Sequence, residues 1–342
     1  MNDDYLWNRT GEPDPEIARL ESLLGSLAYR RRPLDLDRAP AVFRVTTAAS
    51  WIRMARPLAA AAALTLVIGA LWYGLAPRSS AWMVETIAGE PVVGRRTARQ
   101  GATVSLATWV ETDARSSLRI GAVEVGKVEI GPGSRVRIVS SRAGDEHFSL
   151  ERGIIHAMIW AAPGRFSVET PAATAVDLGC SYSLEVDPQG NGVLRVTSGW
   201  VGVEHDGLES LVPRGAVCVM REGRGPGTPR FDDATSAFAE AVDAMDAIEL
   251  GASTVLSPTT LDTLLAEARP RDAMTLWHLL GRVDPATRGR IVDRLAGLAP
   301  PPPGVDRARL RAADRVALDA WWNSLGLGDV ALFRTWRMKE SR

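Results

Sequence analysis

The chain has 342 residues, with 40 Lys and Arg against 41 Asp and Glu, a formal net charge of −1, and two cysteines. This length allows two or three domains. The balanced charge leaves no basic stretch of the kind that binds nucleic acid, so we expect no direct nucleic-acid partner.

The first segment, residues 1–56, contains a predicted amphipathic helix. Asp14 and Pro15 are typical of a helix start, with Asp as the N-cap and Pro at the first helical position. A segment this short cannot bury its apolar side chains in a core of its own. We therefore expect them to dock on a partner protein; the alternatives are that Trp7 folds back onto the helix or that the segment lies on a membrane surface. The candidate contact residues are Tyr5, Leu6, Trp7, Ile17, Leu20, Leu24 and Leu27.

Residues 57–77 form an uncharged apolar run between Arg56 and Arg78. About 20 such residues match the hydrocarbon core of a bilayer, about 30 Å thick, which predicts one transmembrane helix. A buried, alanine-rich core helix is the alternative. Arginine is more frequent on the N-terminal flank, which favours a cytoplasmic N-terminus and C-terminal domains in the periplasm. We therefore expect a single-pass protein of the inner (cytoplasmic) membrane, with the lipid bilayer among its partners.

Between residues 78 and 222 the apolar pattern changes to a period of two, which is typical of strands. Leu118 with Ile120, and Tyr182 with Leu184, are examples. Short runs of this kind are separated by turn residues such as the Gly-Pro-Gly at 131–133. Closely spaced strands with no helix between them predict an all-β domain, either a sandwich or a short β-solenoid.

Several motifs follow one another in this β region. They include Ile130-Gly131-Pro132-Gly133-Ser134, Leu150-Glu151-Arg152-Gly153, Phe166-Ser167-Val168-Glu169-Thr170-Pro171, Gly179-Cys180-Ser181-Tyr182-Ser183-Leu184, Val196-Thr197-Ser198-Gly199-Trp200-Val201 and Leu211-Val212-Pro213-Arg214-Gly215. As a series they resemble the FecR domain, found in membrane-anchored regulators that couple an extracytoplasmic cue to a sigma factor. The resemblance implies an exported sensor or interaction domain and a cytoplasmic segment that binds a sigma factor. The chain departs from the family at Cys180, where the family usually has Thr.

Four glycines of these motifs, namely Gly153, Gly179, Gly199 and Gly215, are predicted to be structural. Glycine is expected where strands turn or pass close to each other, because it adopts positive φ and carries no Cβ.

Cys180 and Cys218 both fall in the part expected to be exported. An even number of cysteines in an oxidising compartment permits one disulfide. The alternative is two small buried hydrophobic residues, because the sequence does not give the separation of their Cα atoms.

Residues 223–232, which include Gly-Arg-Gly-Pro-Gly at 223–227, are predicted to be a linker. From 233 to 342 the apolar period returns to 3.6, which predicts a helical domain, either a bundle or an array of helix hairpins. Helices are expected to begin near Asp232, Ser257 and Asp284, another to contain Trp277, and a single one to span Leu310 to Trp322, with its Trp residues in the core.

The sequence contains none of the patterns that identify a catalytic or metal site. Its four histidines lack zinc-ligand spacing, and CxxC, HExxH, G-x-S-x-G and P-loop motifs do not occur. We therefore expect no enzymatic activity, no metal and no cofactor. Two functions stay open: a FecR-like regulator that binds a sigma factor, or an envelope scaffold that binds another envelope protein or a glycan.

Overall fold

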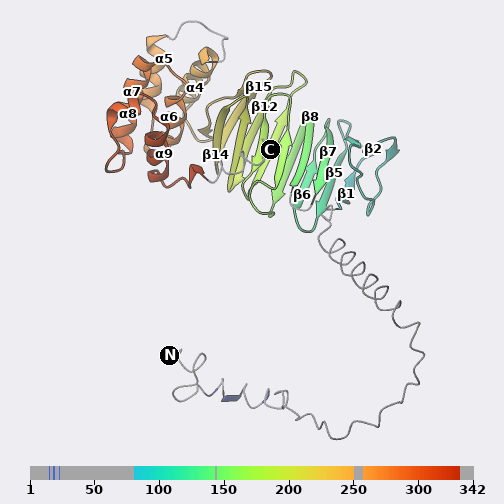
Figure 1. Cartoon of the computed structure of the whole chain (residues 1–342). Coiled ribbons are helices and arrows are strands. Elements are labelled where there is room, and N and C mark those ends of the chain that lie inside the picture. The colour runs from blue at the N-terminus through green and yellow to red at the C-terminus, as the bar shows by residue number, and fades with distance from the viewer. Residues whose placement is uncertain are drawn as a thin grey trace, which may run out of the picture. The chain divides into compact units, whose positions relative to one another are not determined.

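The computed structural model describes residues 81–142, 145–249 and 257–331, together with residues 15, 18, 19 and 23. By internal contacts the chain divides into two units, Met1–Gly74 and Leu75–Arg342. The described residues of the second unit form strands followed by helices (Figure 1). The strands are β1 (Met83–Ala88), β2 (Val92–Val93), β3 (Arg96–Thr97), β4 (Trp109–Glu111), β5 (Ser117–Ala122), β6 (Gly126–Ile130), β7 (Arg135–Arg142), β8 (Asp145–Ile159), β9 (Phe166–Glu169), β10 (Thr174–Asp177), β11 (Ser181–Val186), β12 (Gly192–Ser198), β13 (Trp200–His205), β14 (Leu208–Pro213), β15 (Ala216–Arg221), β16 (Gly225–Pro226) and β17 (Arg230–Phe231).

The strands form two ladders that share β8. Sheet A runs β1–β5–β6–β8–β11–β12–β15, with β16 and β17 both paired to β15. Sheet B runs β3–β2–β4–β7–β8–β9–β10–β13–β14. The N-terminal half of β8 pairs within sheet B and its C-terminal half within sheet A. Because β8 and β9 are parallel and the other pairs antiparallel, the combined sheet is mixed.

The side chains that face inward from both sheets form one hydrophobic core. Trp82, at the start of the described β region, is 1% exposed, and its ring centroid lies 4.8 Å from that of Phe148. Its indole N–H donates to the buried carboxylate of Glu146 at 2.9 Å, which satisfies the only polar group of the ring. The alternation in the sequence identified most of these inward positions, such as Phe166 and Val168.

The helical part comprises α4 (Ser236–Glu249), α5 (Pro258–Glu267), the short 3₁₀ turn η3 (Pro270–Asp272), α6 (Ala273–Leu280), α7 (Pro285–Leu298), α8 (Arg307–Arg311) and α9 (Arg315–Ser324). Asp284 caps α7, since its carboxylate accepts from the N–H groups of Ala286 and Thr287. The single helix expected from Leu310 to Trp322 is two helices. Ala313 adopts φ of 55° and Asp314 caps α9, so the chain restarts there.

The predicted fold class is wrong in its membrane element. Among the described residues no helix is long and apolar enough to cross a bilayer. The longest of them, α4 and α7, have 14 residues each, against the about 20 that a span needs. The run 57–77, to which the transmembrane helix was assigned, lies outside the described residues. The predicted β domain is a large mixed sheet rather than a sandwich or a short solenoid, and the predicted C-terminal helical part is confirmed.

The segment predicted as a linker is part of sheet A. Its residues 225–226 and 230–231 form β16 and β17, which pair with β15.

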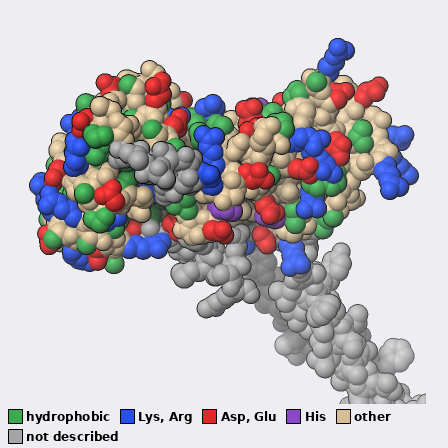
Figure 2. All heavy atoms as spheres, turned by 90° about the horizontal axis from the view of Figure 1, so that it is seen from above, with side chains coloured by type: hydrophobic (Ala, Val, Ile, Leu, Met, Phe, Trp, Pro, Cys, Tyr) green, Lys and Arg blue, Asp and Glu red, His purple; other side chains and the backbone are tan. Residues whose placement is uncertain are grey.

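On the face shown in Figure 2, acidic and basic side chains are interspersed over strands and helices alike.

Candidate functional site

The junction between the strands and the helices is built around the outer edge of β14. One side of β14 pairs with β13. On its other side the backbone N–H of Leu211 donates to Nε2 of His278 at 3.0 Å, and Nδ1 of His278 donates to the carbonyl of Met274 at 2.8 Å. A helix side chain therefore takes the place of a further strand at this sheet edge.

Both bonds require a neutral imidazole with its proton on Nδ1. His278 is 5% exposed. Burial, and to a smaller extent the charge of Arg282, lowers the pKa of His278 from 6.5 to about 3. The ring is therefore neutral at pH 7 and serves as a structural acceptor.

Arg282 connects both sheets to the helices. Its guanidinium donates to the carbonyls of Glu209 in β14 (2.9 Å) and Pro226 in β16 (3.0 Å), and to Oγ of Ser210 (2.7 Å). Trp322 of α9 packs against His278, with the two ring centroids 5.3 Å apart. Trp322 belongs to the core of the β region, so strands and helices share packed side chains.

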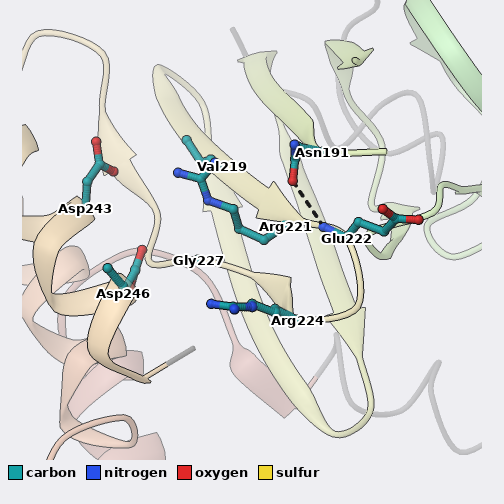
Figure 3. A pocket seen from close by; sticks show the side chains of 9 residues that line it. Asn191, Val219, Arg221, Glu222, Arg224, Gly227, Asp243 and Asp246 are labelled. Atoms are coloured by element: carbon teal, nitrogen blue, oxygen red, sulfur yellow. Dashed lines mark hydrogen bonds between the residues drawn. The ribbon is translucent and has the colours of Figure 1, made fainter. Parts of the chain in front are cut away.

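Beside this junction lies a hollow between the β15–β16 hairpin and α4 (Figure 3). Its volume is about 320 Å³. The hairpin supplies arginines and the helix supplies carboxylates; the lining residues are Asn191, Val219, Arg221, Glu222, Arg224, Gly227, Asp243, Asp246 and Ala247.

The carboxylates of the hollow are held in place by neighbouring donors. Asp246 accepts from the N–H of Thr228 at 2.7 Å and from its Oγ1 at 2.6 Å. Burial raises the pKa of Asp246, which is 8% exposed. Asp243 accepts from Arg230 at 2.8 Å.

Of the two alternatives for the cysteines, the structure has the second: Cys180 and Cys218 are buried free thiols and form no disulfide. Cys180 donates to the carboxylate of Asp177, whereas Cys218 lies 3.4 Å from the carbonyl oxygen of Gly227. Strand β12 separates β11, which follows Cys180, from β15, which contains Cys218. Two strand spacings of about 4.8 Å exceed the Cα separation of about 7 Å that a disulfide tolerates.

Asp177 is a buried carboxylate, 1% exposed, and its burial raises its pKa from 3.8 to about 6. Because the folded state holds this proton more tightly than the unfolded chain, stability falls as pH rises from about 4 to about 6. At about 1.4 kcal/mol per pKa unit, the loss is about 3 kcal/mol. We expect Asp177→Asn, which does not titrate, to lack this loss. Urea unfolding of both proteins at pH 4 and pH 7 measures the difference; parallel pH dependence would contradict the assignment.

All four glycines named from the sequence have positive φ: 93° at Gly153, 86° at Gly179, 72° at Gly199 and 77° at Gly215. A Cβ on Gly199 would lie 2.2 Å from the carbonyl oxygen of Gly179. Gly179 and Gly199 therefore belong to one close backbone approach, at the start of β11 and the end of β12.

The predicted partner-binding residues Tyr5, Leu6, Trp7, Ile17, Leu20, Leu24 and Leu27 lie outside the described residues. Of their neighbours, Pro15, Ala18, Arg19 and Leu23 are described, and each is helical and exposed.

A serine, a histidine and a carboxylate meet on the outer face of sheet B. Nδ1 of His147 lies 2.8 Å from Oγ of Ser167, and Nε2 lies 3.4 Å from Oε2 of Glu169. No sequence pattern connects these three residues, because their proximity comes from the parallel register of β8 and β9. Ser167 is only 5% exposed, so its hydroxyl is not open to a substrate. Among the described residues no group of three or more His, Cys, Asp or Glu could hold a metal ion.

No family model and no curated protein matches this chain. Two crystal structures of a candidate anti-sigma factor from Parabacteroides distasonis, at 1.65 and 2.50 Å resolution, are similar to part of it. Each has 16% sequence identity and a TM-score of 0.33, and the match covers 40% of this chain. The chain spans 63% of that protein, less than two thirds of its length. A likeness this low carries no argument about function.

Proposed function

We propose that the chain is a regulator of the FecR kind that acts by binding other molecules. Its N-terminal segment holds a sigma factor, and its strands and helices receive the signal. The observation that supports this proposal is that the residues of the FecR-like motifs have structural roles in the fold. Gly153 and Gly199 occupy close backbone approaches, and Phe166 and Val168 are buried core residues. The motif series thus corresponds to positions that a shared fold would require.

The proposal predicts that the full-length chain, immobilised, retains a sigma factor of its own organism, identified by mass spectrometry. We expect Leu20→Asp combined with Leu24→Asp to weaken this binding on the order of 100-fold, because two charges would be buried in an apolar contact. Glu16→Ala, on the polar side of the same predicted helix, is the matched control and should bind normally. Retention of no sigma factor, or equal retention by the double variant, would contradict the proposal.

An envelope scaffold is the second candidate, favoured by exposed apolar side chains on the β region. Val123 is 92% exposed, Met158 57% and Trp160 49%. The indole N–H of Trp160 donates to the carbonyl of Val123 at 2.9 Å, so these two residues adjoin. Adjoining exposed apolar residues are typical of protein-binding surfaces. A scaffold would keep its partner after removal of residues 1–50, whereas the regulator would lose its sigma factor.

A further inference from the structure

The hollow between the β15–β16 hairpin and α4 carries opposite charges on its two walls. Arg221 ends β15 and Arg224 lies in the turn before β16, and both extend toward the helix (Figure 3). Asp243 and Asp246 stand one helical turn apart on α4 and line the facing wall. The space between the walls is about 320 Å³, at the small end of the range for small-molecule sites.

The helix wall is rigid. Asp246 is fixed by two hydrogen bonds from Thr228, and Asp243 by Arg230. Gly227 lines the space beside Asp246, where a Cβ would lie 2.5 Å from Oδ2 of that carboxylate. Each carboxylate keeps lone pairs that can accept from a ligand, because an ionised carboxylate has about four acceptor positions.

The hairpin wall differs from the helix wall in the pairing of its charges. Among the described residues, neither the guanidinium of Arg221 nor that of Arg224 has a hydrogen-bond or ion-pair partner. Hydrogen bonds, chiefly from Asn191, lower the pKa of Asp187, and the charge of Arg221 adds a smaller contribution. The hairpin is held at its turn, where Oδ1 of Asn191 accepts from the N–H of Glu222 at 3.4 Å. The two arginines thus face the carboxylates without pairing with them.

We propose that this hollow binds a small zwitterion, a free α-amino acid or a short peptide. The ligand carboxylate pairs with Arg221 and Arg224, and its ammonium group pairs with Asp243 and Asp246. Other charge classes fit less well: a dianion such as phosphate is repelled by Asp243, Asp246 and Glu222, and a simple cation is repelled by the two arginines. A ligand with both charges satisfies both walls and joins the hairpin to the helix.

Binding of the zwitterion at this site would be the signal that the proposed regulator receives. That role rests on the proposed function, whereas the binding itself does not. Binding is measured directly on the purified full-length chain, without a sigma factor. Failure of sigma-factor capture would therefore leave this inference untouched, and absence of a ligand would leave sigma-factor binding untouched.

Isothermal titration with the dipeptide Ala-Ala and with free alanine tests the charge requirement. We expect saturable binding of at least one of them. N-acetyl-Ala-Ala and Ala-Ala amide, which each lack one charge, should bind at least tenfold more weakly, because each loses charge-assisted hydrogen bonds. Equal binding of the blocked forms, or no saturable binding of either zwitterion, would overturn the proposal.

Variants of the hairpin locate the binding. Arg221→Gln and Arg224→Gln are each expected to weaken affinity for the zwitterion at least tenfold, and neither should disturb folding, because both side chains are exposed. Arg214→Gln, another exposed arginine in the turn before β15, is the matched control and should bind like the parent chain. Unchanged affinity in both hairpin variants would place the ligand elsewhere and overturn the assignment.

Discussion

Replacing Gly153 with alanine is expected to destabilise the protein by at least about 4 kcal/mol, or to prevent folding. Gly153 lies where β8 passes from sheet B to sheet A, with φ of 93°. An L-residue held in this region of φ costs about 1–3 kcal/mol. The alanine variant is therefore destabilised by backbone strain even without a steric clash.

The larger part of the loss comes from a clash with the neighbouring turn. A Cβ on Gly153 would lie 2.3 Å from Cα of Ser134, which is backbone and cannot rotate away. Moving Ser134 would break two hydrogen bonds of its hydroxyl. Oγ of Ser134 accepts from the N–H of Ile154 at 2.9 Å and donates to the carbonyl of Ile154 at 3.1 Å. These bonds hold the β6–β7 turn against β8, so both sheets would be affected.

Gly133→Ala is the matched control. Gly133 also has positive φ, 67°, but a Cβ there would meet no heavy atom within 4 Å. We expect this variant to lose only the backbone penalty, about 1–2 kcal/mol. Urea unfolding followed by circular dichroism measures both variants. Equal losses would show that the clash at Ser134 does not determine the stability of the bend.

The sequence predicted local structure well wherever a pattern and its end signal coincide. The Asp-Pro at 284–285 predicted the start of α7, and α7 begins at Pro285 with Asp284 as its cap. The alternation of Phe166 and Val168 predicted inward positions, and both side chains are buried.

Boundaries were harder to predict where one residue type serves two purposes. Gly153 was predicted to lie where strands turn or pass close to each other, and β8 continues through it with a change of sheet. The alternation of Val123 with Val125 is typical of a strand, but Val123 lies in the β5–β6 turn, exposed to solvent. Glycine permits both a turn and a bend, and a short alternation can extend past a strand end.

The site could not be predicted, because its contacts join distant parts of the chain. Leu211 and His278 are 67 residues apart, and Arg282 and Glu209 are 73 apart. No spacing rule connects such positions. In the sequence, Arg221 and Arg224 cannot be told apart from other surface charges. Only the fold shows that α4 lies opposite them.

His278→Ala is expected to cost about 3–5 kcal/mol at pH 7. The change removes a fully packed ring and leaves the buried N–H of Leu211 without its acceptor. His156→Ala is the matched control, since His156 is exposed on the outer face of sheet A, and it should change stability by less than about 0.5 kcal/mol. Chemical unfolding at pH 7 measures both; a similar small loss in the two variants would contradict the structural role of His278.

The same residue should make the protein sensitive to acid. The pKa of His278 is lowered to about 3 in the folded state against 6.5 in the unfolded chain, so as pH falls the unfolded chain takes up the proton first. Stability is therefore complete above pH 6.5 and is lost progressively toward pH 3, by up to about 5 kcal/mol. His278→Gln keeps an acceptor but does not titrate, so the difference in unfolding free energy between parent and variant should shrink by about 2 kcal/mol between pH 6.5 and 4.5. The effect of Asp177 is present in both proteins and cancels in this difference. A difference that stays constant with pH would mean that His278 is not held neutral against the edge of β14.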